Sequence, residues 1–95
     1  MARFFVEVPH EADTVVCTHA VRIFLNTGCH FLTTADWGCR DGEHKAWMTV
    51  EANTREEVRR ILPPAYRTQA KIVQLNKFTM AEIEELLRLH QRNAA

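Results

Sequence analysis

The sequence predicts one α+β domain over residues 1–95, with a four-stranded antiparallel sheet, two helices on one face and an extra C-terminal helix. Three observations support this fold class. The N-terminal residues alternate between apolar and polar side chains, an Asp-Gly pair separates two β-rich segments, and two capping boxes mark later helix starts. A chain of 95 residues is long enough to bury one core.

The first strand and the first helix follow from local patterns. Residues 3–8 have the alternation of a strand with one buried face. Asp13 is placed to cap a helix that runs to about Thr27, and Gly28 follows where helices commonly end. Apolar residues recur at helical spacing between them. We therefore expect a strand followed by a helix.

A β-hairpin is predicted next. Segments 29–37 and 43–52 are rich in β-branched and aromatic residues, which favours a pair of strands. Between them, Asp41 and Gly42 are a strong signal for a two-residue type I′ turn. We therefore expect both segments to be strands that meet at this turn.

Such a turn fixes the register of the hairpin. Trp37 would face Ala46, on the side that the helices cover, and Asp36 would face Trp47 on the other side. A one-residue bulge at a neighbouring glycine would reverse the faces of one strand. The assignment of faces depends on the absence of such a bulge.

The second half of the chain adds a helix, a strand and a final helix. Thr54 and Glu57 form a capping box that opens a short helix, which a pair of prolines ends. Segment 66–78 predicts a long fourth strand. Thr79 and Glu82 form a second capping box and open a helix with an apolar stripe. The βαββαβ order with a trailing helix is the split βαβ pattern of ferredoxin-like folds.

The fourth strand predicts a partner. Ala70 and Ile72 lie on one of its faces, and Val73 and Leu75 lie on the other. The helices of one chain cover one face of such a sheet, so the second face needs another cover. The final helix and a second subunit are the candidates. We expect a homodimer that forms through the sheet faces.

Nearly the whole chain resembles the small dimeric α+β barrel proteins of the ferredoxin-like class. The resemblance rests on the strand order, on hairpin 35–52, on segment 54–79 and on the trailing helix. The sequence is similar to a set of uncharacterised bacterial domains and, more distantly, to muconolactone isomerase. The resemblance implies facing sheets and a cleft beside them. It implies no catalytic motif, because the group includes isomerases, monooxygenases, stress proteins and metal binders.

Composition excludes several classes of partner. Twelve Lys and Arg residues balance twelve Asp and Glu residues, so the basic surface that nucleic acid requires is absent. The N-terminal segment has no long apolar run, so we expect neither a signal peptide nor a membrane span. We expect a cytoplasmic location.

The three cysteines are expected to be free thiols, because their number is odd. They are Cys17, Cys29 and Cys39, and we expect Cys17 and Cys29 to lie near the core.

The interpretation that we favour is binding of a small apolar or aromatic molecule, with isomerase-like or oxygenase-like activity left open. The predicted ligand-binding residues are Phe5, Glu7, Trp37, Trp47 and Met48. The predicted catalytic residues are Asp36, His44 and Arg67. Proton transfer and carboxylate binding need a titratable or charged group beside an apolar wall, and these residues would supply it. Trp37 and Met48 have a plain alternative as core residues.

A metal site is an alternative interpretation. Cys39 and His44 would be neighbouring ligands, with His10, His30 or Cys29 as the third. The sequence lacks the paired spacing that is typical of zinc sites. It therefore favours an ordinary thiol and an ordinary histidine, and it predicts no metal ligand and no cofactor. A non-catalytic structural or interaction module is a further alternative.

Overall fold

A computed structural model of the protein describes residues 1–94, with side chains as far as Gln91. The strands are β1 (Ala2–Pro9), β2 (Asp36–Trp37), β3 (Lys45–Ala52) and β4 (Lys71–Leu75). The helices are α1 (Thr14–Asn26), α2 (His30–Thr33), α3 (Arg55–Ile61) and α4 (Met80–Ala94). Short 3₁₀ turns occupy Cys39–Asp41 and Pro64–Tyr66.

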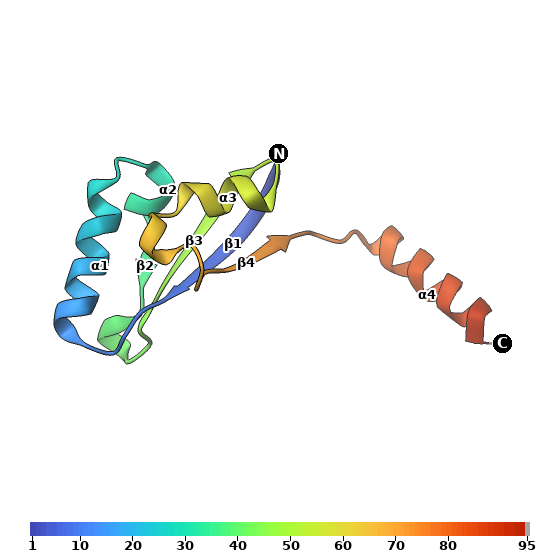
Figure 1. The fold of residues 1–95 in the computed structure, drawn as a ribbon. Helices are drawn as coiled ribbons and strands as arrows, with labels where there is room; N and C mark the ends of the chain where they lie inside the picture. Colours follow the sequence, from blue (N-terminus) through green and yellow to red (C-terminus); the bar gives the residue numbers. More distant parts are fainter. Residues whose placement is uncertain (95) are drawn as a thin grey trace.

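The four strands form one antiparallel sheet in the order β2-β3-β1-β4. Helices α1, α2 and α3 lie over one face of this sheet, and α4 extends away from it (Figure 1). We refer to the sheet face that these three helices leave bare as the open face. The predicted α+β class is confirmed, and the arrangement is broadly compatible with a ferredoxin-like fold.

The core lies between the sheet and its covering helices. Phe4, Val6 and Val8 of β1 are buried, as the alternation in the sequence predicts. Phe24 of α1 and Leu32 of α2 pack in the same cluster. The apolar face of the sheet therefore anchors the helices through side chains that the strand period places on one side.

The predicted helix starts are confirmed. Asp13 accepts hydrogen bonds of 2.9 and 3.0 Å from two backbone N–H groups in the first turn of α1. Thr54 accepts a hydrogen bond from the N–H of Glu57, and Thr79 accepts one from the N–H of Glu82. Each cap satisfies backbone donors that the first turn of a helix cannot pair internally.

The prediction of one strand over 29–37 is wrong. His30–Thr33 forms α2, and Asp36–Trp37 is the part of this segment that pairs with β3. The hydroxyls of the two following threonines bond back to the carbonyl of His30. The helical turn places Leu32 in the core with 1% of its surface exposed. Packing therefore overrides the β preference of the segment.

The hairpin keeps the predicted register with a different turn. Trp37 pairs with Ala46. The connection is longer than the two-residue turn at Asp41-Gly42 that the sequence predicts, because Cys39–Asp41 forms a 3₁₀ turn that ends at Gly42 with φ of 85°. The longer connection takes the same number of residues from each strand of the hairpin. The pairing between β2 and β3 therefore keeps the predicted register.

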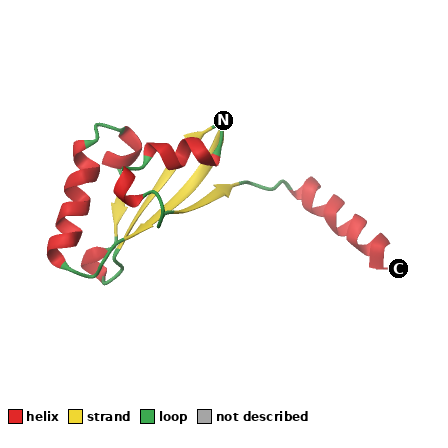
Figure 2. Ribbon diagram, in the orientation of Figure 1, coloured by secondary structure: helices red, strands yellow, loops and turns green. Residues whose placement is uncertain are grey.

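The last part of the chain also departs from prediction. β4 covers Lys71–Leu75 of the predicted segment 66–78, and Tyr66 belongs to the 3₁₀ turn Pro64–Tyr66. α4 begins after Thr79 as predicted, but it projects from the rest of the chain (Figures 1 and 2). Among the described residues, no helix has the length and apolar character that crossing a membrane requires.

The open face is apolar in part. Phe5, Trp47 and Leu75 are half-buried there, and Val73 is 38% exposed. This agrees with the two-sided apolar pattern of β4 in the sequence. Within the described chain, α4 does not cover this face (Figure 2).

Candidate metal centre

Two histidines and two cysteines converge at one end of the sheet. The side chains are His10, Cys17, Cys39 and His44, and their ligand atoms all lie within 4.8 Å of one another. We refer to them as the four-residue cluster. His10 directly follows β1, Cys17 belongs to α1, Cys39 belongs to the hairpin loop and His44 directly precedes β3, so the cluster forms only in the folded chain.

The sheet ladder positions the two histidines. Pro9 pairs with Lys45 at the end of the β1–β3 ladder. One step further, the backbone N–H of His10 donates a hydrogen bond of 3.0 Å to the carbonyl of His44. The two imidazole rings lie 5.8 Å apart and perpendicular. Backbone pairing therefore fixes the two rings side by side.

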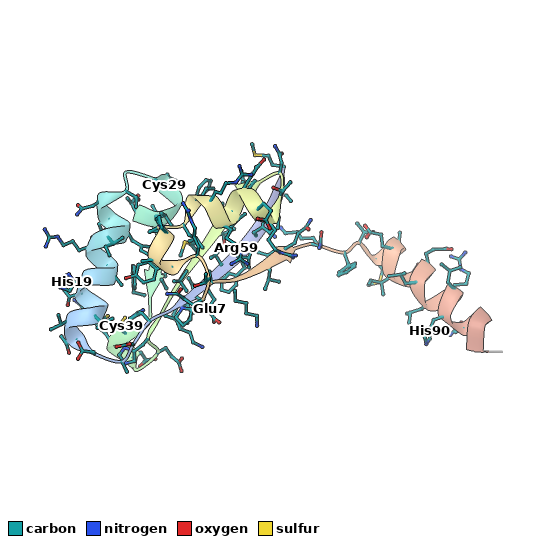
Figure 3. All side chains as sticks on the ribbon, in the orientation of Figure 1. Glu7, His19, Cys29, Cys39, Arg59 and His90 are labelled. Atoms are coloured by element: carbon teal, nitrogen blue, oxygen red, sulfur yellow. The ribbon has the colours of Figure 1, made fainter. Side chains whose placement is uncertain are left out.

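The helix cap and the hairpin loop position the two cysteines. The N–H of Cys17 donates to the carbonyl of the capping residue Asp13 at 2.8 Å, so the cap sets where this thiol stands. Cys39 follows Gly38, where an added Cβ would lie 2.6 Å from the ring of Trp47. The loop can pack this closely only because residue 38 is glycine. Figure 3 shows Cys39 beside the N-terminal part of α1.

The distances suit a tetrahedral metal ion. The Nε2 atom of His10 lies 3.1 Å from the Sγ atom of Cys39. Zinc bonds of about 2.3 Å to sulfur and 2.0–2.1 Å to nitrogen give tetrahedron edges of roughly 3.3–3.8 Å. A greatest separation of 4.8 Å is therefore about 1 Å from the bound geometry.

The protonation of two members of the cluster follows from their burial. Burial lowers the pKa of His10, and the neighbouring His44 lowers it further, which favours the neutral imidazole that binds metals. Burial raises the pKa of the Cys39 thiol to about 11, with a further contribution from Cys17. A metal ion would displace this thiol proton.

Two buried nitrogen atoms lack a partner. The Nδ1 atoms of His10 and His44 are buried, and neither has a hydrogen bond to the described residues. Buried polar atoms are nearly always paired, so each of these nitrogens needs a metal ion, another ligand or an ordered water as its partner. One imidazole offers a metal ion a single nitrogen, so His10 would bind through either Nδ1 or Nε2. A cavity of about 330 Å³, lined in part by Cys17, Cys39 and His44, gives access to the cluster.

The structure brings some of the predicted metal ligands together and leaves others apart. Cys39, His44 and His10 are the predicted candidates that meet in the cluster. Cys29 and His30 lie at the start of α2, and Figure 3 shows Cys29 at the other end of α1 from Cys39. All three cysteines are thiols, as expected.

Cys17 is the ligand that sequence reasoning missed, because the sequence suggested a core position for it. Its spacing from the cap was the available signal. A thiol one turn into a capped helix lies at the end of the helix that faces the preceding strand. His10, which directly follows β1, lies at the same end of α1.

The predicted ligand-binding residues occupy two faces of the sheet. Phe5, Glu7 and Trp47 lie on the open face, where the Nε1 of Trp47 donates a hydrogen bond of 3.0 Å to Glu7. Trp37 packs against the core on the other face, and Met48 is buried there with 6% of its surface exposed. The sheet therefore separates these five side chains into two groups.

The predicted catalytic residues are also separated. Asp36 is exposed on β2, and His44 belongs to the four-residue cluster. Arg67 donates hydrogen bonds to the carbonyls of Leu62 at 2.9 Å and Arg60 at 3.0 Å, so it holds the end of α3. Its bonds give Arg67 a structural role.

A groove of about 710 Å³ runs beside α1 and adjoins the cluster. Its apolar wall includes Val21, Leu25 and Trp37, and Arg22 and Arg40 add positive charge. Asp36, Cys17 and Cys39 also line it. The groove therefore contains Trp37 and Asp36 of the predicted site residues, and it shares two cysteines with the cluster.

Comparison with known protein families, curated proteins and solved structures finds no match for this chain. The resemblance to the dimeric α+β barrel proteins stays an expectation.

Proposed function

We propose that this protein binds one zinc ion through His10, Cys17, Cys39 and His44. The observation that carries the proposal is the convergence of two thiols and two imidazoles within 4.8 Å. Two sulfur and two nitrogen ligands are the donor set of Cys₂His₂ structural zinc sites. Magnesium and calcium prefer oxygen ligands, so this donor set disfavours them.

The role of the metal follows from the number of ligands. Four protein ligands fill a tetrahedral zinc ion and leave no position for substrate, which is the pattern of a structural site. The ion would tie the end of β1, the first turns of α1 and the hairpin loop together. Because the site forms only in the folded chain, metal binding adds to the free energy of unfolding.

The thiol ligands support a reducing location. Oxidation of Cys17 or Cys39 would remove a metal ligand, and cytoplasmic thiols are kept reduced. We therefore propose that the protein works in the cytoplasm. The strand order with β1 and β3 at the centre likewise supports the ferredoxin-like topology as the finer description of the fold.

The experiment is a metal titration of the full chain after removal of metal. Zinc is titrated in competition with a chromophoric chelator, and cobalt is used as a spectroscopic substitute for tetrahedral sulfur and nitrogen ligation. We expect one metal ion per chain and a cobalt spectrum with sulfur-to-metal charge transfer. Cys17→Ser should weaken binding by more than the roughly 10- to 100-fold that loss of an outer-shell partner costs.

Cys29→Ser is the matched control, because Cys29 is a half-buried thiol outside the cluster. It should leave the stoichiometry and the cobalt spectrum unchanged. An unaltered affinity in Cys17→Ser, or an equal loss in Cys29→Ser, would contradict the proposal.

The groove beside α1 supports a second candidate function, binding of a small aromatic anion. Val21, Leu25 and Trp37 offer an apolar wall, and Arg22 and Arg40 offer charge for a carboxylate or sulfonate. This candidate function agrees with the small-molecule interpretation of the sequence, but it places the ligand beside Trp37 and not beside Trp47.

An anilinonaphthalene sulfonate probe tests this second function by its fluorescence. We expect saturable binding that Leu25→Glu abolishes, because the new carboxylate lies in the groove and repels the sulfonate. Val15→Glu is the control, since Val15 is an exposed apolar residue of the same helix outside the groove. Equal binding in both variants would place the probe elsewhere and remove this candidate.

A further inference from the structure

α4 presents an apolar stripe that the described residues of its own chain leave bare. Ile83, Leu86 and Leu87 recur at spacings of three and four, which places them on one side of the helix. Leu86 and Leu87 are 54% and 58% exposed. Contiguous exposed apolar surface of this kind marks an interaction site.

The open face of the sheet is a second bare apolar surface on the same chain. Phe5 pairs with Val73 across β1 and β4, and Leu75 lies at the next position of β4 on this face. Arg3 pairs with Leu75, and Lys71 ends the same row. The apolar surface near β4 is therefore bordered by two basic residues and by Glu7, which pairs with Lys71.

The charged borders of the two surfaces are complementary in part, because the open face carries Glu7 and Glu51 beside its basic residues. Glu82 and Glu84 stand directly before and after Ile83, so they flank the apolar stripe of α4 on either side. Arg3 and Lys71 border the open face. A helix laid on this face would place acidic side chains near basic ones and apolar side chains against apolar ones.

The lengths of the two surfaces also match. α4 has 15 residues, which corresponds to about 22 Å. β1 has 8 residues, which corresponds to about 26 Å. Residues 76–79 direct α4 away from its own sheet, so the helix is presented to a second molecule (Figure 1).

We propose that two copies of this chain associate by exchanging α4, so that the helix of each copy lies on the open face of the other. A two-fold pair covers both bare surfaces of both chains at once. This arrangement differs from direct contact between two sheets, because a helix lies between them. The proposal is independent of metal binding.

Sedimentation velocity on the full chain tests the exchange. The wild type should have the mass of two chains at micromolar concentration. Leu87→Asp and Val73→Asp should each reduce it to the mass of one chain, because each buries a charge in the apolar contact. Ala81→Asp, on the opposite side of α4, and Gln74→Asp, beside Val73 on the other face, are the controls and should stay dimeric.

Mixing the two disruptive variants distinguishes exchange of α4 from direct sheet contact and from helix-to-helix contact. The helix of the Val73→Asp chain and the sheet of the Leu87→Asp chain are both intact, so the mixture should regain dimer that neither variant forms alone. Dissociation by Val73→Asp alone would indicate direct sheet contact, and dissociation by Leu87→Asp alone would indicate helix-to-helix contact. Either result, or a monomeric wild type, overturns the proposal. Circular dichroism verifies that each variant is folded.

Discussion

The Nε2 atom of His10 lies 3.1 Å from the Sγ atom of Cys39, although 29 positions separate the two residues in the chain. The β1–β3 ladder brings the end of β1 to the base of the hairpin, and the hairpin loop supplies the thiol. Half of the proposed zinc ligands therefore depend on sheet register, and the others depend on the loop and on α1. This division allows each part to be perturbed separately.

Zinc should stabilise the protein by mass action. At a free zinc concentration a thousandfold above Kd, the free energy of unfolding should rise by about 4.1 kcal/mol. Urea denaturation with and without zinc measures this gain. His44→Ala should abolish it, whereas His30→Ala, outside the cluster, should retain it. A gain of equal size in His44→Ala would mean that zinc binds elsewhere.

Acid should destabilise the metal-free fold from about pH 6.5 downward. The pKa of His10 is lowered from 6.5 by burial and by His44, so the unfolded chain takes up a proton that the folded chain resists. The stability contributed by neutral His10 is thus present above pH 6.5 and is lost as the pH falls. The groups that face it are His44, Cys17 and Cys39.

Urea denaturation of the metal-free protein between about pH 7.5 and 5.5 measures how the free energy of unfolding changes with pH. This range brackets the ordinary pKa of histidine. His10→Gln should flatten the slope. His19→Gln is the control, because His19 is an exposed residue of α1 outside the cluster (Figure 3). An identical slope in wild type and His10→Gln would contradict the expected role of His10.

Gly38→Ala should disturb both stability and zinc binding. The new Cβ would lie 2.6 Å from the Trp47 ring and 2.8 Å from the carbonyl oxygen of Glu43. Relieving such overpacking costs about 1–3 kcal/mol and would shift the loop that holds Cys39. Denaturation and zinc competition measure the two effects.

Gly28→Ala is the comparison for Gly38→Ala. Gly28 has a positive φ of 72° with open space around its Cα, so alanine there should cost about 1–2 kcal/mol through backbone strain. Because Gly28 lies outside the hairpin loop, zinc affinity should not change. Wild-type zinc affinity in Gly38→Ala would show that the loop does not need its close contact with Trp47.

Arg67→Ala should lower the free energy of unfolding by about 1–3 kcal/mol, because it leaves backbone carbonyls at the end of α3 without their charged donor. Arg67→Lys should restore little, since one ammonium group cannot reproduce the fork of the guanidinium. Zinc stoichiometry should stay at one. Unchanged stability in Arg67→Ala would contradict the structural role and would favour the catalytic role that the sequence suggests.

Signals that act within a few residues made much of the fold predictable. The alternation of β1, the caps at Asp13, Thr54 and Thr79, and the register of the hairpin were all confirmed. Capping and strand period depend on local backbone chemistry, so they are present in the sequence before any tertiary contact forms.

Features set by tertiary contacts were not predictable in this way. Leu32 becomes helical because the core needs its side chain, against the β preference of its neighbours. Cys17 joins the cluster because α1 docks beside the hairpin loop. Its spacing from the cap places it at the right end of α1 but does not report that docking. The direction of α4 likewise depends on residues 76–78, which lie between β4 and the cap at Thr79 and have no strong conformational signal.

Cys17 and Cys39 line both the proposed metal centre and the groove beside α1. Two binding events that share a wall are thermodynamically linked, and the linkage is reciprocal. If a groove ligand favours the positions that these thiols take around the ion, it will tighten zinc binding by some factor. Zinc will then tighten binding of that ligand by the same factor. A molecule that binds the groove would therefore change the fraction of chains that hold zinc.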